Sequence, residues 1–217
     1  MQRFDGTVMQ RVIAYVDGFN LYFGLRSQGL RGALWLDIPS LMSRFLAPGQ
    51  SLVATKYFTS HLSGPPDKAR RQSVYLEALA SRPGVELFFG QYQTEQIRCR
   101  ACGERWPVNR EKMTDVNIAV ELMKDAMRDR LDIAFLVSAD SDLAGPVAAF
   151  RELWPAKRIL AIFPPGRGSI VLERLANGKR RIRRNLVLAS QMPDEVIGPD
   201  GYAKHRPPAW RSDGQGR

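Results

Sequence analysis

Runs of apolar residues alternate along the chain with segments in which apolar residues recur at helical spacing. Runs rich in branched and aromatic residues predict strands at 11–16, 52–58, 85–89, 132–137, 158–163 and 186–189. The intervening segments predict helices from about residue 19, at 39–46, 66–80, 115–127 and 143–153, and briefly after Gly168. Strands that alternate with helices are typical of a parallel sheet covered on both faces, so we expect an α/β fold.

The length of 217 residues is enough for one well-buried domain with tails. We expect this domain to span 11–195, after an N-terminal tail at 1–10. The regular pattern breaks at 91–109, where turn residues surround two cysteines, and this indicates an excursion from the sheet, an inserted hairpin or knuckle. The segment 196–217 is rich in glycine, proline and charge, which predicts a disordered basic tail.

Composition narrows the function classes. The net charge of +10 and pI near 10.1 favour polyanionic partners, which in a cytoplasm means chiefly nucleic acid. No apolar run approaches the roughly 20 residues of a membrane span, and the sequence also argues against a cleaved signal peptide. Two cysteines cannot form a disulfide framework, so we expect a reducing cytoplasm and no membrane partner.

Acidic residues stand where predicted strands end. Asp17 closes the first strand, Asp140 and Asp142 follow the strand through Val137, and Asp115 opens a helix. The carboxyl ends of parallel strands meet at one edge of a sheet, so these acids are expected to gather there. Clustered carboxylates repel one another unless a hard cation neutralises them, and oxygen ligands alone favour Mg²⁺ or Mn²⁺ over zinc.

Each acid also has an ordinary structural interpretation. Aspartate before glycine is common in turns, and aspartate at a helix start is a good N-cap, so a single one of these residues is weak evidence for a site. Asp125, Asp129 and Asp132 lie among lysines and arginines, and we expect them to be solvated. The joint placement of the other four acids at strand ends is what favours a metal site.

Motifs in a fixed order resemble a known family. They are Val-Asp-Gly-Phe-Asn at 16–20, Glu-Lys-Met-Thr-Asp-Val at 111–116, Val-Ser-Ala-Asp-Ser-Asp-Leu at 137–143 and Ser-Gln-Met-Pro-Asp at 190–194. Together they resemble the NYN domain group of PIN-like nucleases, which includes LabA-like bacterial proteins. The resemblance implies a three-layer α/β/α, Rossmann-like fold with a mostly parallel central sheet. It also implies a metal-dependent ribonuclease that hydrolyses phosphodiesters with a metal-activated water.

The resemblance also implies residue roles. Asp17 would be the central metal ligand, with Asp115, Asp140 and Asp142 as the remaining acids, and Asn20 would orient Asp17 or the substrate. Lys112 and Ser138, from the same motifs, are predicted to contact the substrate, although Lys112 is equally well explained as an exposed loop lysine.

Basic residues outside the motifs are candidates for holding the RNA backbone. Arg167 stands in a glycine turn, and Lys179, Arg180 and Arg181 belong to a basic run, although solvated surface positions explain each one equally simply.

The pair Cys99-x-x-Cys102 followed by glycine resembles half of a zinc knuckle. Structural zinc needs four ligands, so three interpretations stay open. His61 and another group complete the site, two chains share it in a homodimer, or no zinc binds.

The main rival to an enzyme is an RNA-binding or regulatory adaptor that keeps the acids without catalysis. A phosphatase with an aspartyl nucleophile is disfavoured because the position two residues after Asp17 is Phe19, where such enzymes need an acid. A P-loop nucleotidase is disfavoured because no Gly-x4-Gly-Lys-Ser/Thr occurs.

Overall fold

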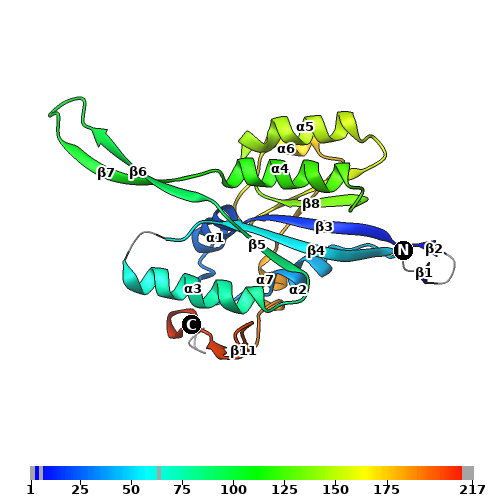
Figure 1. The fold of residues 1–217 in the computed structure, drawn as a ribbon, viewed down its shortest axis with the longest axis horizontal. Helices are drawn as coiled ribbons and strands as arrows, with labels where there is room; N and C mark the ends of the chain where they lie inside the picture. The colour runs from blue at the N-terminus through cyan, green and yellow to red at the C-terminus, as the bar shows by residue number, and fades with distance from the viewer. Residues whose placement is uncertain (1–2, 5–6, 63–64, 212–217) are drawn as a thin grey trace.

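A six-stranded parallel sheet forms the centre of the molecule (Figure 1). The computed structural model describes residues 3–4, 7–62 and 65–211, and it describes the side chains of all of these except 3–4, 7–8, 91–95 and 107–112. The strand order is β10-β9-β8-β3-β4-β5, and every neighbouring pair is parallel. The strands are β3 Gln10–Asp17, β4 Gln50–Thr59, β5 Val85–Phe89, β8 Ile133–Val137, β9 Arg158–Phe163 and β10 Gly178–Arg181.

Helices cover both faces of the sheet, which confirms the predicted three-layer α/β/α architecture (Figure 1). One face carries α1 Gly18–Ser27, α2 Ile38–Ser43, α3 Pro66–Ala80 and α7 Arg184–Leu188, and the other carries α4 Thr114–Met127, α5 Ala144–Leu153 and α6 Ile170–Leu175. Side chains of the central strand β3 alternate between the two helical layers. Val12, Ala14 and Val16 pack toward α1 and α3, and Ile13 and Tyr15 pack toward α4 and α5.

The excursion near residue 91 is an antiparallel hairpin made of β6 Gln91–Arg98 and β7 Arg105–Lys112. It lies between β5 and α4 in the chain and extends away from the three layers (Figure 1). Its strands pair only with each other among the described residues. The two cysteines therefore lie at the free end of a projecting ribbon.

One sequence prediction near the end of the sheet is wrong, and one strand was not predicted. Residues 186–189 were expected to be a strand, but 184–188 form helix α7, in which Val187 is buried against the core. The last strand is instead β10, whose Gly-Lys-Arg-Arg sequence has no apolar pattern because three of its residues are exposed at the sheet edge.

The segment after residue 195 is ordered as far as Arg211, contrary to the predicted disordered tail. It forms the hairpin β11 Glu195–Ile197 and β12 Ala203–His205, followed by the 3₁₀ turn η3 Pro208–Trp210. Trp210 packs edge-on against Tyr75 of α3 at 6.0 Å between ring centroids, and Lys204 pairs with Glu77. Contacts with α3 hold this segment on the domain, so the predicted domain end at 195 falls inside a packed element.

The remaining short elements are β1 Arg3–Phe4, β2 Thr7–Val8, η1 Arg31–Ala33 and η2 Ser141–Leu143. No helix among the described residues has the length and apolar character that crossing a bilayer requires.

Candidate metal centre

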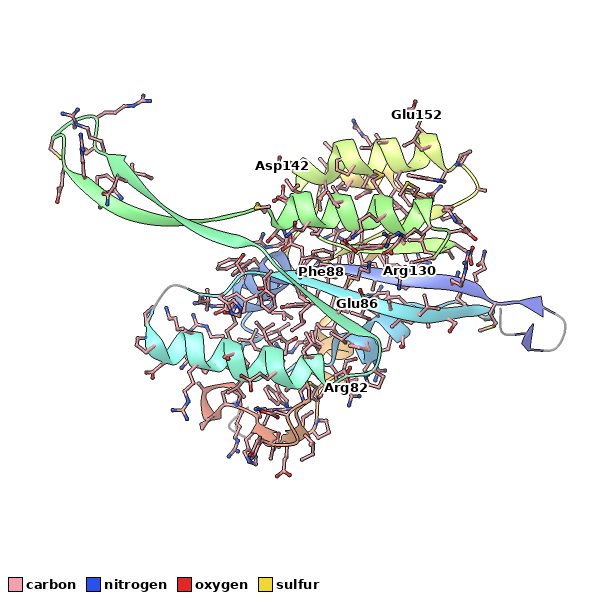
Figure 2. The ribbon with its side chains drawn as sticks, in the orientation of Figure 1. Arg82, Glu86, Phe88, Arg130, Asp142 and Glu152 are labelled. Atoms are coloured by element: carbon pink, nitrogen blue, oxygen red, sulfur yellow. The ribbon has the colours of Figure 1, made fainter. Side chains whose placement is uncertain are left out.

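Four acids meet at the carboxyl edge of the sheet. Asp17 is the last residue of β3, and Asp140 lies three residues beyond the end of β8, the neighbouring parallel strand. Asp142 follows in η2, and Asp115 lies in the first turn of α4, which packs over these strands. Figure 2 shows Asp142 at the end of the α4 and α5 pair nearest to the projecting hairpin. The structure thus brings together the acids that the sequence predicted.

Three of these carboxylates form a tight group. One oxygen from each of Asp115, Asp140 and Asp142 lies within 4.8 Å of the other two. Burial, followed by the negative charges of Asp17, Asp140 and Asp142, raises the pKa of Asp115 to about 6. No ion pair among the described residues neutralises any of the three, and a divalent cation would relieve their repulsion. The donor set therefore fits a hard metal ion such as Mg²⁺ or Mn²⁺.

Asp17 lies beneath this group and is only 5% exposed. Its Oδ1 accepts a hydrogen bond from the backbone N–H of Asn20 at 2.9 Å, so it caps α1, and its Oδ2 accepts one from the hydroxyl of Ser138 at 3.0 Å. Burial raises the pKa of Asp17 and Asp140 adds to the effect, while these hydrogen bonds and the charge of Arg167 oppose it. Both oxygens are fixed, so Asp17 is a preorganised carboxylate.

Ser138 and Asn20 brace the loop that carries the acids. The Ser138 hydroxyl also accepts a hydrogen bond from the backbone N–H of Asp140 at 3.0 Å, and the Asn20 side-chain oxygen accepts one from the N–H of Ala139 at 3.2 Å. Because Ser138 is fully buried, it is better placed to orient Asp17 and Asp140 than to contact the substrate as predicted. The backbone N–H of Asn20 contacts Asp17 while its side chain holds the acidic loop at Ala139, so the orienting role that the resemblance implies for Asn20 stays a prediction.

Backbone conformation at the start of α4 is unusual. Met113, the residue before the helix, has φ of 81°, a left-handed conformation that costs a non-glycine residue about 1–2 kcal/mol. This turn sets where Asp115 enters the site, and strained backbone of this kind is found most often at functional sites. Lys112 precedes it, but the Lys112 side chain lies outside the described residues.

The predicted basic residues separate into two groups. Arg167 lies above Phe23 of α1, with its guanidinium carbon 5.9 Å from the ring centre, and Arg181 donates to the backbone oxygen of Arg167 at 2.8 Å. Both stand at the carboxyl edge that holds the acids. In contrast, Lys179 pairs with Glu173, and Arg180 lines a cavity beside the first residues of β8 and β9. Arg167 and Arg181 are thus the better placed for a backbone phosphate.

The cysteines are both free thiols at the tip of the β6–β7 hairpin. Backbone N–H groups of Cys102 and Ala101 donate to the sulfur of Cys99, and together with the Cys102 thiol they lower the pKa of the Cys99 thiol. His61 stacks on Phe89 at 4.3 Å, near the base of the hairpin. Within the described residues no third histidine, cysteine or acid joins the two thiols, so the alternative in which His61 completes the site is not formed.

A buried ionic network beneath α4 was missed by the sequence analysis. Lys56 of β4 is fully buried and lies 2.7 Å from both Glu121 and Asp125 of α4. The hydroxyl of Tyr15 donates to Asp125 at 2.7 Å, and Arg130 lies 3.3 Å from the same carboxylate. Figure 2 shows Arg130 beside Glu86 at the edge of this network. The expectation that Asp125 is solvated is wrong, because only 1% of it is exposed. Of the other two acids expected to be solvated, Asp129 is exposed and Asp132 pairs with Arg11.

A cavity of about 540 Å³ was also missed. It lies on the α1 and α3 side of the sheet behind Gly18, which lines it together with residues of η3. Its aromatic lining and its cations come from several elements: Tyr22, Tyr57, Tyr75, Trp210, Arg26, Arg31, Lys68 and Arg71. Trp210 comes from the segment predicted to be disordered, so little in the sequence indicates this cavity.

The three-layer fold with acids at the carboxyl edge of a parallel sheet defines the PIN-like class of proteins. A family model for the NYN domain matches residues 11–176, and the chain belongs to the NYN domain family. This confirms the resemblance seen in the motifs.

Individual relatives are more distant. The chain is 26% identical to a Pseudomonas putida protein named 6-hydroxy-3-succinoylpyridine 3-monooxygenase, over 97% of this chain and 78% of that protein. A crystal structure of a protein of unknown function from Vibrio parahaemolyticus matches 85% of this chain and 98% of that chain, with a TM-score of 0.55 at 19% identity. The structural match supports the fold alone.

Proposed function

We propose that this protein is a metal-dependent ribonuclease that hydrolyses phosphodiester bonds at the acidic group. The observation that carries the proposal is the convergence of Asp115, Asp140 and Asp142 within 4.8 Å, above the buried Asp17, in a domain of a nuclease-like family. A chain with net charge +10 whose three grouped acids have no ion-pair partner among the described residues is suited to attract a polyanion and hold a cation at the point of reaction.

The residues have separable tasks in this proposal. Asp115, Asp140 and Asp142 would hold Mg²⁺ or Mn²⁺, which when bound supplies Lewis-acid stabilisation of a phosphate and lowers the pKa of water. Asp17, which the resemblance implies as the central metal ligand, lies outside the group of three acids. Its proposed task is instead to keep the acidic loop in place from below, where the backbone N–H of Asn20 and the hydroxyl of Ser138 hold it. Arg167 and Arg181 would hold the RNA backbone at the same edge, because their guanidinium groups attract the negatively charged phosphate.

The test is cleavage of labelled single-stranded and structured RNA in Mn²⁺, Mg²⁺ or EDTA. Asp142→Asn and Asp17→Asn are compared with Glu152→Gln, an exposed acid at the opposite end of α5 from Asp142 (Figure 2). Mutation of a residue that supports metal ligands typically lowers activity about 10–100-fold. Both site variants are therefore expected to lose at least this much activity, and Glu152→Gln is expected to retain the activity of the wild type.

The outcomes separate the enzyme from the adaptor. Cleavage that needs metal and is lost in both site variants supports the ribonuclease. RNA binding without cleavage, equal in wild type and Asp17→Asn, supports a non-catalytic RNA-binding adaptor instead. Cleavage that persists in EDTA contradicts the metal centre.

The cavity behind Gly18 favours a second candidate, oxidation of a small heteroaromatic acid. Aromatic walls beside arginines and lysines suit a planar anion, and the Pseudomonas relative is named for a monooxygenase acting on a pyridine. Monooxygenation puts one atom of O₂ into the substrate and reduces the other to water with two electrons from a reductant such as a reduced nicotinamide. Oxygen uptake in the presence of a hydroxypyridine acid and this reductant tests the second candidate. Trp210→Ala, in the cavity, is compared with Trp106→Ala, a hairpin residue outside the cavity. Uptake that is equal in both variants contradicts it.

A further inference from the structure

The tip of the β6–β7 hairpin has the form of one half of a tetrahedral metal site. Cys99 directly follows β6, which ends at Arg98, and Cys102 lies in the turn, followed by Gly103 with φ of 75°. The turn closes through hydrogen bonds from Gly103 N–H to the Cys99 oxygen at 3.0 Å and from Cys99 N–H to the Glu104 oxygen at 2.8 Å. With two backbone N–H groups directed at the Cys99 sulfur, both thiols are arranged on one tight turn, as zinc knuckles require.

The rest of this chain does not complete the site within the described residues. No further histidine, cysteine or acid is grouped with the two sulfurs. His61 stacks on Phe89 at the base of the hairpin, and the 8 residues of β6 at about 3.3 Å each put roughly 26 Å between base and tip. Two thiolates leave two positions of a tetrahedral zinc ion open.

The hairpin also needs support that its own strands do not supply. Its strands pair with no other strand among the described residues, and it extends away from the three layers (Figure 1). An isolated two-stranded ribbon is marginally stable in water. A metal ion at the tip would fix the turn at the end that the body of the protein does not hold.

The positive charge at the hairpin tip favours a zinc site shared by two chains, because four thiolates on zinc would neutralise the repulsion between the two tips. Arg98, Arg100 and Arg105 are exposed around the turn, and a Cβ placed on Gly103 would be 3.4 Å from the guanidinium of Arg98. Two such cationic tips repel each other when brought together. A zinc ion held by four thiolates carries a net negative charge, so it would attract the arginines of both chains.

We propose that Cys99 and Cys102 are half of a structural Zn²⁺ site, which the same two cysteines of a second copy complete. The resulting homodimer joins the two domains tip to tip and leaves the acidic edge of each domain uncovered. The zinc site is separate from the proposed catalytic centre, so either can fail without the other.

The experiment measures zinc content and mass on the full chain purified in reductant with Zn²⁺. We expect one zinc per two chains and a mass about twice 24.4 kDa by light scattering. Cobalt in place of zinc is expected to give the thiolate-to-metal absorption of a sulfur site, which oxygen ligands at the acidic group cannot give. A chelator is expected to convert dimer to monomer, and added Zn²⁺ to restore it.

Cys102→Ser is expected to lose the metal and the dimer, whereas Ala101→Ser, in the same turn, keeps both. Thermal unfolding reports whether the Cys102→Ser domain is intact, and RNA cleavage per chain tests the proposed function independently. Three results would overturn the proposal: one zinc per monomeric chain, a dimer that survives Cys102→Ser or the chelator, or a zinc-free monomer.

Discussion

Replacing Asp115 with asparagine is expected to stabilise the metal-free protein. Burial and three neighbouring carboxylates raise the pKa of Asp115 to about 6 from 3.8, which means that the folded state disfavours its charge. Asparagine has nearly the same shape and no charge, so it removes this penalty. The same change removes a proposed metal ligand, so stability and metal binding should move in opposite directions.

The size of the expected stabilisation and the pH range over which it develops follow from the raised pKa of Asp115. A shift of this size corresponds to about 3 kcal/mol, which solvent screening of a half-buried group reduces to about 1–2 kcal/mol. Because the folded state binds the proton more tightly than the unfolded state, the wild type loses this stability as the pH rises from about 4 to about 6. The variant should equal the wild type below about pH 4 and exceed it by the full amount above about pH 6.

Urea unfolding in EDTA at several pH values measures this difference, with Glu152→Gln as the exposed-acid control. Adding Mn²⁺ at about 100 times its dissociation constant should then stabilise the wild type by about 2.7 kcal/mol and Asp115→Asn by much less. The reasoning is refuted if the variant is less stable than the wild type in EDTA at pH 7.5, or if their difference does not change with pH.

Three further variants test the surrounding structure. Lys56→Met leaves Glu121 and Asp125 without their buried cation, so urea unfolding should show a loss of about 3–5 kcal/mol, and a loss below 1 kcal/mol would contradict the buried network. Ser138→Ala removes the hydrogen bond that orients Asp17, so RNA cleavage should fall about 10–100-fold while the fold persists by circular dichroism, and unchanged cleavage would exclude the positioning role. Gly18→Ala puts a Cβ 2.8 Å from a backbone oxygen of β4, so the melting temperature should fall with a loss of about 1–3 kcal/mol, and an unchanged melting temperature would contradict this packing.

The acids at the sheet edge were accessible from the sequence because strand ends are local features. An apolar run that stops at Asp17, and another that stops before Asp140, locate two carboxylates once the sheet is taken as parallel. The apolar run at 186–189 was misread because so short a run is equally consistent with a buried turn of helix. The edge strand β10 gave no apolar signal at all.

Features that depend on distant pairing could not be read from the sequence. Lys56 and Asp125 are 69 positions apart, and each looks like a surface charge until the packing of α4 on β4 brings them within 2.7 Å. The same holds for the final segment, whose polar composition hides one apolar contact, Trp210 against Tyr75. Composition describes average solvation, and a few tertiary contacts are enough to override it.

Helix α4 connects the buried network to the acidic group. Asp115 lies in its first turn, and Glu121 and Asp125 lie further along the same helix on Lys56. Burial and the charges of the neighbouring acids together disfavour the charged Asp115 by about 1–2 kcal/mol, and moving the start of the helix away from the sheet would relieve both. Removing Lys56 would leave Glu121 and Asp125 buried without a cation, at a cost of about 3–5 kcal/mol, so the pairing fixes α4 against β4. Lys56 therefore keeps the carboxylates close before a metal binds, and Lys56→Met should weaken Mn²⁺ binding although Lys56 itself pairs with α4 and not with the acidic group.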